Sequence, residues 1–333
     1  MTTQEWDAPG GPVLAGIREP DHTLALELVR ITEAAAIAAG RWVGHGDKNN
    51  GKAAAIDAMH GLIMSVSVRG VVVIGEGDKR DTPVLFNGED VGDGDGPVCD
   101  VGISAGDGAL SLVGDVPYSI SAIAVAERGA MYRPGSIHYM EKLAVGPDCV
   151  DVVDINRPVA ENLRAVAKAK DVRVPDVVVA VLNRPRHQEL VHEIRDAGAR
   201  VHLLEGGDVA GAIAAARSES PVDMLLGTGG AGEGVIAAAA LSCLGGSLQA
   251  RLRPKDSGNG EKQPETGHDF DKVLYTDDLV RGEDVLFCAT GVTGNELLRG
   301  VQQHSGYTST QSIVMCSKPD TLRIVRSEHR HAK

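Results

Sequence analysis

The chain has 333 residues, of which 43% are hydrophobic and 24% are charged, and its net charge at pH 7 is −13. Nonspecific nucleic-acid binding is excluded as a main function, because a phosphate polyanion needs a basic surface. No apolar stretch reaches the ~18 to 20 residues of a membrane span, and the residues after Met1 are too polar for a signal peptide. The five cysteines form no Cys-x-x-Cys. We therefore expect reduced cysteines in a cytoplasmic protein.

The first half of the chain predicts helices followed by a buried strand. Residues 1–20 contain Pro and Gly without apolar periodicity and are expected to form a flexible arm. Amphipathic helices are expected over 22–42 and 52–67. Residues 71–74 are all β-branched and fit a strand that is buried on both faces.

Two acidic segments follow predicted strands. Gly75 and Gly77 allow a sharp turn in which Glu76 stands at the end of the first strand. A second acidic turn is expected over 99–109. Carboxylates at two strand ends are what a divalent cation bridging phosphate oxygens needs. The alternative is that both segments are solvated turns.

The second half alternates between strand and helix patterns. Strands are expected over 176–182, 201–204 and 223–226, and helices over 186–197, 208–216 and 233–244. This alternation predicts a mainly parallel sheet covered by helices. A further helix is expected over 295–304. The break at 156–158 divides the prediction into an N-terminal lobe, 21–157, and a C-terminal lobe, 158–333.

Three strand-to-helix turns of the second half are expected to face one crevice: 184–187, 205–208 and 227–234. Arg184 and Arg186 flank a proline and suit a phosphate clamp, although a solvated loop is the alternative. Glu233 would stabilise the dipole of its helix whether or not it binds a metal. The turn 227–232 also spells Gly-x-Gly-x-x-Gly, but no acid follows at the distance that a dinucleotide site needs.

These motifs, taken together, resemble those of a known family. The resemblance is to the class II fructose-1,6-bisphosphatases and extends from about residue 22 to 330. The segments that carry it are Gly46-Asp47-Lys48, Ile74-Gly75-Glu76-Gly77, Tyr139-Met140-Glu141-Lys142, Val145-Gly146-Pro147, Arg184-Pro185-Arg186-His187, Gly207-Asp208-Val209-Ala210, Gly229-Gly230 with Glu233-Gly234, and Ala289-Thr290-Gly291-Val292-Thr293.

The resemblance implies a fold and an activity. The fold is the two-lobed α/β sugar-phosphatase fold, layered α-β-α-β-α, that is shared with inositol monophosphatases. The activity is removal of the 1-phosphate from fructose 1,6-bisphosphate with Mg²⁺ or Mn²⁺, as part of carbohydrate metabolism of the gluconeogenic type. A homodimer or homotetramer is also implied.

The sequence departs from the family at the metal-binding motifs. Lys52, Arg80 and Ser104 stand where the family has acids of the metal site, and Ala109 stands where it has the threonine that positions the water. Gly206 replaces an acid of a turn. Carried over from the family as catalytic and metal-binding residues of a weakened site are Glu76, Asp107 and Glu233. The predicted substrate-binding residues are Lys48, Lys52, Arg80, Gly108, Tyr139, Arg184, Arg186 and Asp208.

Three hypotheses remain open at this stage. The first is a divergent, metal-assisted sugar-phosphate phosphatase, a phosphoric monoester hydrolase. The second is a repurposed enzyme of a specialised biosynthetic pathway that binds a sugar phosphate and carries out glycosyl or anomeric transfer, with Lys52 and Arg80 replacing the metal charge and the metal itself lost. The third is a non-catalytic paralogue.

Overall fold

The computed structural model describes residues 19–80, 82–107, 117–254 and 269–331. The predicted N-terminal arm, 1–20, lies outside the described residues except for its last two, which begin helix α1 (Glu19–Gly40). Helix α2 (Lys48–Ile63) packs along α1. The described part of the chain contains no helix with the length and apolarity that a membrane crossing requires.

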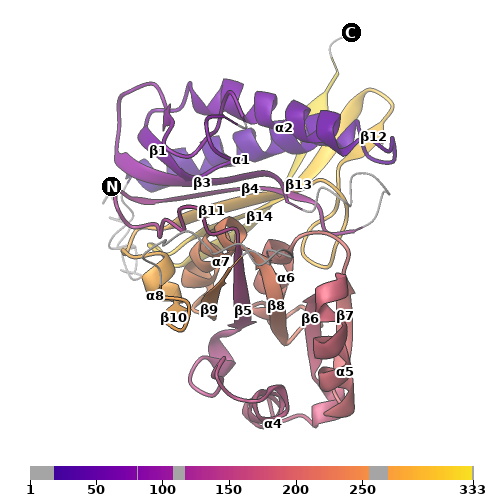
Figure 1. Cartoon of the computed structure of the whole chain (residues 1–333). Coiled ribbons are helices and arrows are strands. Elements are labelled where there is room, and N and C mark those ends of the chain that lie inside the picture. The colour runs from indigo at the N-terminus through magenta and orange to yellow at the C-terminus, as the bar shows by residue number, and fades with distance from the viewer. Residues whose placement is uncertain (1–18, 81, 108–116, 255–268, 332–333) are drawn as a thin grey trace, which may run out of the picture.

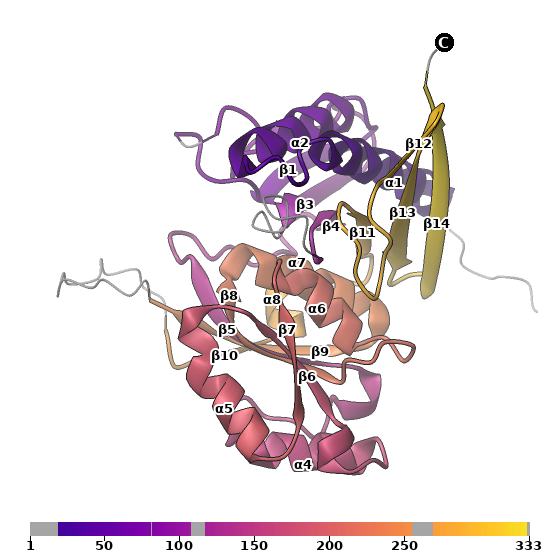
Figure 2. The same ribbon diagram turned by 90° about the vertical axis from the view of Figure 1, so that its right-hand side faces the viewer.

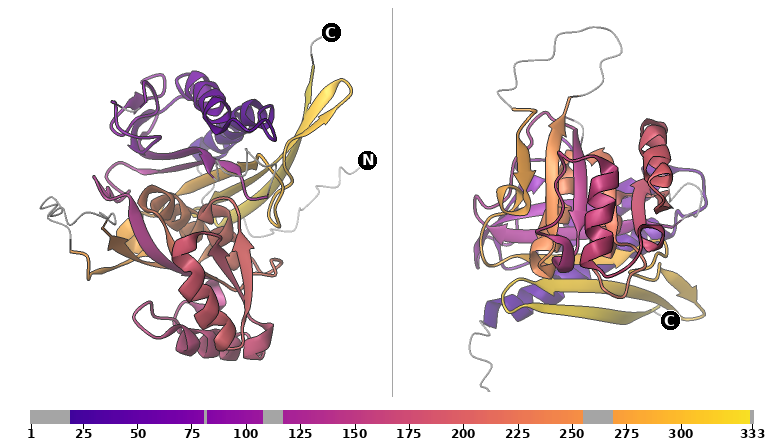
Figure 3. Two further views of the ribbon diagram at one scale, coloured as in Figure 1. Left: turned by 45° about the vertical axis from the view of Figure 1, so that its right-hand side comes forward. Right: turned by 90° about the horizontal axis from the view of Figure 1, so that it is seen from below.

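The first sheet carries strands from both ends of the chain. Its order is β12-β13-β11-β4-β3-β1-β2, with β14 paired along β13. The strands are β1 (Arg69–Ile74), β2 (Asp90–Val91), β3 (Val98–Asp107), β4 (Ile120–Glu127), β11 (Leu286–Gly291), β12 (Gln302–His304), β13 (Tyr307–Cys316) and β14 (Thr321–Arg330). The long β13–β14 hairpin forms one edge of the molecule (Figure 3).

The second sheet is mixed rather than mainly parallel. Its order is β10-β9-β5-β8-β6-β7. The strands are β5 (Tyr139–Val145), β6 (Val178–Leu182), β7 (Arg200–Leu204), β8 (Met224–Gly230), β9 (Ser247–Arg253) and β10 (Val273–Tyr275). Strand β6 is parallel to β7 and β8 as predicted, whereas β5 enters antiparallel between β8 and β9. The sequence-based division at residue 157 therefore does not coincide with the division between the sheets.

Helices separate and cover the two sheets, which confirms the α/β class and the layered α-β-α-β-α order (Figures 1 and 2). Helices α1 and α2 pack on the outer face of the first sheet, and α4 (Val159–Ala169) and α5 (Gln188–Asp196) on the outer face of the second. Between the sheets lie α6 (Asp208–Ala215) and α7 (Ala231–Leu244), with α8 (Thr276–Leu279) beside them. Short 3₁₀ turns occur at Pro147–Cys149, Val174–Asp176 and Pro185–His187.

Helix α7 fits between the sheets because its residues are small. It is buried on nearly every side and contains a run of alanines, 237–240, with side chains that are fully buried. A helix that is apolar all round is expected only where it is enclosed by protein. The narrow helix thus lets the two sheets share one apolar core.

Two predicted elements are wrong. Residues 99–107 of the predicted second acidic turn belong to β3, and 108–109 lie outside the described residues. Asp100 is fully buried there and accepts hydrogen bonds from the backbone N–H groups of Gly129 and Met131. The helix predicted over 295–304 is a loop followed by β12, because the side chain of Asn295 accepts from the N–H groups of residues 297 and 298 and closes a local turn.

A polar cluster joins segments of the two sheets. The hydroxyl of Tyr118, just before β4, donates to the carboxylate of Glu296, and Nε2 of His202 on β7 lies 3.1 Å from the same carboxylate. Partial burial would raise the pKa of Glu296, but the hydrogen bonds with His202 and Tyr118 outweigh it and lower this pKa from 4.5 to about 2.

The depressed pKa makes the contribution of Glu296 to stability pH-dependent. A carboxylate of this kind stabilises the fold above its unfolded pKa, and the contribution is lost as pH falls toward the folded value. We expect Glu296→Gln to lower the melting temperature at pH 7, with the gap to wild type narrowing as the pH falls from 4.5 toward 2. Thermal unfolding across this range, with the exposed Glu193→Gln as control, measures the gap. A difference in melting temperature that is independent of pH would contradict the lowered pKa of Glu296.

Candidate functional site

A cavity of about 1010 Å³ lies between elements of both sheets. The end of β1, the middle of β3, the segment 133–139 and the start of α7 form its wall. Charged or polar lining side chains include Lys52, Glu76, Ser104, Tyr139 and Glu233. The cavity thus collects residues that the sequence placed at separate strand ends.

Glu76 is fixed at the carboxyl end of β1. Strand β1 is parallel to β3, but its last residue, Ile74, pairs with Gly102, so β3 continues past the end of β1 and the two strand ends do not lie side by side. The N–H of Gly75 donates to Oδ1 of Asn87 at 2.8 Å, and the N–H of Glu76 donates to the carbonyl of Leu85 at 2.9 Å. A Cβ at position 75 would lie 2.2 Å from the Leu85 carbonyl oxygen, so this close approach requires glycine.

Lys52 forms an ion pair with Glu76 at the cavity wall. Asp47 caps the start of α2 and thereby places Lys52 one turn into the helix. Its Nζ lies 2.8 Å from Oε2 of Glu76, and the other oxygen, Oε1, accepts from the N–H of Ala105 at 2.5 Å. Burial lowers the pKa of Lys52, but the charge of Glu76, its hydrogen bond and the charge of Glu233 raise it overall. The ammonium therefore stays charged at neutral pH.

A second ion pair is buried behind the cavity. Nζ of Lys142 on β5 donates to Oδ2 of Asp208 at 2.8 Å, and the two side chains are 1% and 7% exposed. A Cβ at Gly229 would lie 2.0 Å from that carboxylate oxygen, so only glycine leaves room for the pair. The sequence reasoning gave Lys142 no role. The available signal was a lysine that alternates with the apolar Met140 and Ala144 on one face of β5, since a fully buried lysine is nearly always paired.

Glu233 lies in the first turn of α7 and has a perturbed pKa. Burial raises its pKa above the usual range, Lys142 opposes the shift, and the negative charges of Asp208 and Glu76 add to it. Its carboxylate folds over Gly230, where a Cβ would lie 1.8 Å from Oε2. Glu233 can therefore hold a proton at a higher pH than an exposed glutamate, beside the cavity.

The three turns of the second half contact one another, but residues of 227–234 line the cavity whereas 184–187 and 205–208 do not, so the three turns do not face one crevice as predicted. The guanidinium of Arg184 donates to the carbonyls of residues 183, 205 and 206, and that of Arg186 donates twice to the carbonyl of Thr228, at 3.0 and 2.8 Å. Arg186 also lies over the ring of Tyr139, a residue of the cavity wall, 5.5 Å from its centroid. Arg184 contacts backbone, and neither arginine lines the cavity itself.

His187 has a structural role in the same turn. It is buried, its Nδ1 donates to the carbonyl of Leu182 at 2.8 Å, and its Nε2 accepts from the N–H of Thr228 at 2.8 Å. Burial lowers its pKa, and the two hydrogen bonds require the neutral ring.

The remaining predicted site residues are placed as follows. Arg80 is exposed in the turn after Glu76 and does not line the cavity. Asp107 ends β3, and Lys48 begins α2, but their side chains lie outside the described residues, as does Gly108. Their predicted roles stay predictions.

The described residues do not fit a divalent cation at Glu76. Both carboxylate oxygens of Glu76 already have partners, and one partner is a cation. Across the described ranges, no group of three His, Cys, Asp or Glu side chains could hold a metal ion. Ca²⁺ takes about 6 to 8 oxygen ligands, and Mg²⁺ demands near-ideal octahedral geometry.

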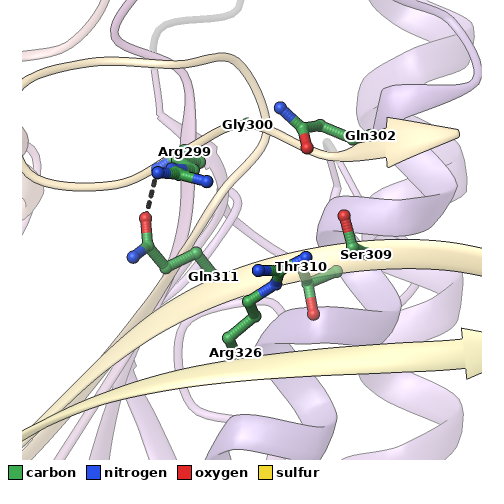
Figure 4. Close-up of a pocket in the computed structure, with 7 residues that line it drawn as sticks. All are labelled: Arg299, Gly300, Gln302, Ser309, Thr310, Gln311 and Arg326. Carbon is green, nitrogen blue, oxygen red and sulfur yellow. Dashed lines mark hydrogen bonds between the residues drawn. The ribbon is translucent and has the colours of Figure 1, made fainter.

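A second, smaller pocket of about 170 Å³ lies at the edge of the first sheet (Figure 4). It is lined by Arg299, Gly300, Gln302, Ser309, Thr310, Gln311 and Arg326. The N–H of Arg299 donates to Oε1 of Gln311 at 2.7 Å, which fixes the loop over β13. This pocket shares no residue with the large cavity.

The fold and the cavity define a layered α/β protein with a charged site between its sheets. A family model described as "Bacterial fructose-1,6-bisphosphatase, glpX-encoded" matches residues 22–329. The chain belongs to this family, which confirms the predicted resemblance. The family is generally dependent on divalent metal ions.

Curated relatives match over nearly their full length. A "D-fructose 1,6-bisphosphatase class 2/sedoheptulose 1,7-bisphosphatase" of Crocosphaera subtropica is 37% identical over 339 residues, covering 93% of this chain and 96% of the relative. A "Fructose-1,6-bisphosphatase class 2" of Haemophilus influenzae is 35% identical over 322 residues, with the same coverage. A protein of Thermosynechococcus vestitus with the first of these names is 37% identical over 336 residues.

Proposed function

We propose that this protein is a phosphoric monoester hydrolase that removes phosphate from a sugar phosphate. The observation that carries the proposal is the cavity between the sheets, which brings Lys52, Glu76 and Glu233 together in a member of the glpX family. The names of the relatives point to a ketose bisphosphate as substrate, of six or seven carbons.

The charged residues suggest complementary roles. The ammonium of Lys52 attracts the phosphate that is to be cleaved, and Arg186 with Tyr139 binds the remainder of the substrate at the rim. Glu233, with its raised pKa, holds the proton that the leaving alkoxide of the sugar needs. The buried Lys142–Asp208 pair keeps β5 and α6 in position behind them.

Release of inorganic phosphate from fructose 1,6-bisphosphate and sedoheptulose 1,7-bisphosphate tests the proposal, with Mg²⁺, with Mn²⁺ and with EDTA. We expect turnover of at least one of these substrates. Arg186→Ala should raise KM by about 10-fold, because a charge-assisted contact to the substrate is lost. Arg164→Ala, an exposed arginine of α4, is the matched control and should leave KM unchanged. No phosphate release under any of the three conditions would refute a phosphatase.

A second candidate function is favoured by one observation, the Lys52–Glu76 pair where the family motif places a metal ligand. In this alternative the cavity binds a sugar phosphate for glycosyl or anomeric transfer in a biosynthetic pathway. Arg80, the other cation of that hypothesis, is exposed outside the cavity. Consumption of a sugar phosphate without phosphate release would favour it, and binding without any turnover would favour a non-catalytic paralogue.

Three further expectations accompany the proposal. The metal of the family reaction is expected to be Mg²⁺ or Mn²⁺ where a metal takes part. The chain is expected to act in the cytoplasm and as a homodimer or homotetramer. Light scattering of the purified protein measures the oligomeric state.

A further inference from the structure

We propose that Lys52 is a built-in cation of the site: its ammonium replaces a divalent ion beside Glu76, so that phosphate binds at this end of the cavity without a metal. The inference rests on the proposed function, since it concerns the phosphate end of the same site. It goes further by assigning the positive charge to the chain itself.

The first argument is the occupancy of Glu76. The side chain is 6% exposed, one oxygen lies 2.8 Å from the Lys52 ammonium, and the other accepts from the Ala105 N–H. A dication at Oε2 would have to displace the ammonium or lie beside it. Two like charges at contact distance in a partly buried site repel each other strongly.

The second argument is the scarcity of other ligands. Ser104, on the neighbouring strand β3, is 9% exposed and lines the cavity with a neutral hydroxyl. Asp78 and Glu233 also line the described cavity wall, but together with Glu76 they do not form a group that could hold a metal ion. Hard divalent cations select charged oxygen ligands, and this wall offers few.

The third argument is the reach of Lys52. Its side chain is 41% exposed and lines the cavity, so the ammonium is accessible to a ligand. An ammonium carries three donors, and among the described residues its acceptor is Glu76. As far as the described residues go, donors remain for phosphate oxygens. A purely structural ion pair would not need this access.

Calorimetric titration with fructose 1,6-bisphosphate, in EDTA and in Mn²⁺, tests the inference. We expect the dissociation constant of the wild type to differ less than about 2-fold between the two conditions, a change of under 0.5 kcal/mol. Lys52→Met should weaken binding in EDTA by about 10-fold or more, because charge-assisted hydrogen bonds are lost. Lys168→Met, an exposed lysine of α4, should bind as the wild type does.

Lys52→Asp provides the complementary test. It places a second carboxylate beside Glu76, so we expect loss of binding in EDTA and recovery of binding in Mn²⁺. Mn²⁺ binding is measured directly by electron paramagnetic resonance, and circular dichroism checks that each variant is folded. Should Lys52→Asp not fold, Lys52→Met alone decides.

The inference is overturned by any of three results. The first is that the wild type binds the substrate only in Mn²⁺, or in neither condition. The second is that Lys52→Met binds as tightly as the wild type. The third is that the wild type binds stoichiometric Mn²⁺ and that Glu76→Gln loses it. The proposed function fails separately: metal-independent binding without phosphate release supports Lys52 and rejects the phosphatase, whereas phosphate release combined with binding that requires metal supports the phosphatase and rejects Lys52.

Discussion

Replacing Lys142 by methionine is expected to lower the free energy of unfolding by about 3 to 5 kcal/mol, because removing one partner of a buried ion pair leaves an uncompensated charge. Lys142 is 1% exposed, and its ammonium lies 2.8 Å from the carboxylate of Asp208, which is 7% exposed. The lost ammonium leaves that carboxylate close to Glu233, whose negative charge is unfavourable to it. Urea unfolding followed by circular dichroism measures the loss.

Two further variants make the test specific. Lys142→Met combined with Asp208→Asn should recover part of the stability, because the double variant no longer buries an unpaired charge. Lys318→Met breaks an exposed pair with Glu283 and should change little, since exposed ion pairs contribute little. A loss for Lys142→Met no larger than that of Lys318→Met would show that the buried pair is not important for stability.

Replacing Glu233 by glutamine is expected to lower kcat about 100-fold or more, which is the contribution typical of a positioned proton donor. Glutamine keeps the shape and the contact over Gly230 but cannot give up a proton. Steady-state phosphate release from the chosen sugar bisphosphate measures the effect. Glu161→Gln is the matched control, since Glu161 is also the third residue of its helix but lies on α4, outside the cavity wall.

Although Glu233→Gln is expected to lower kcat, it is expected to stabilise the fold. The pKa of Glu233 is raised in the folded protein, so the fold is favoured at low pH and loses this contribution as the pH rises from 4.5 through the raised value. Glutamine does not titrate, so Glu233→Gln should gain in melting temperature relative to wild type across that rise. Unchanged kcat, or a melting-temperature difference independent of pH, would contradict the role of Glu233.

The sequence predicted the parts of the site that depend on local pattern. The β-branched run 71–74 followed by glycine placed Glu76 at a strand end, and the strand–helix alternation placed Arg186, Asp208 and Glu233 on turns that meet. These features follow from periodicity and turn chemistry, which are local.

The rest depends on contacts that are distant in sequence. Strand β5 enters the second sheet between β8 and β9, which no local pattern reveals, and this placement brings Lys142 to Asp208. Asp100 belongs to the segment 99–109, for which the sequence predicts an acidic turn. It is accommodated in β3 because backbone N–H groups of the segment after β4 donate to one of its carboxylate oxygens, and Nε of Arg128 lies 3.9 Å from the other.

Helix α7 also determines how the molecule unfolds. The helix belongs to the core between the sheets, and it contacts strands of both, including β3, β4 and β11 of the first and β5, β8 and β9 of the second. Neither sheet can lose α7 without exposing the alanine-lined core of the other. The two sheets are therefore coupled into one cooperative unit. Because α7 also carries Glu233, any opening that separates the sheets would dismantle the cavity at the same moment.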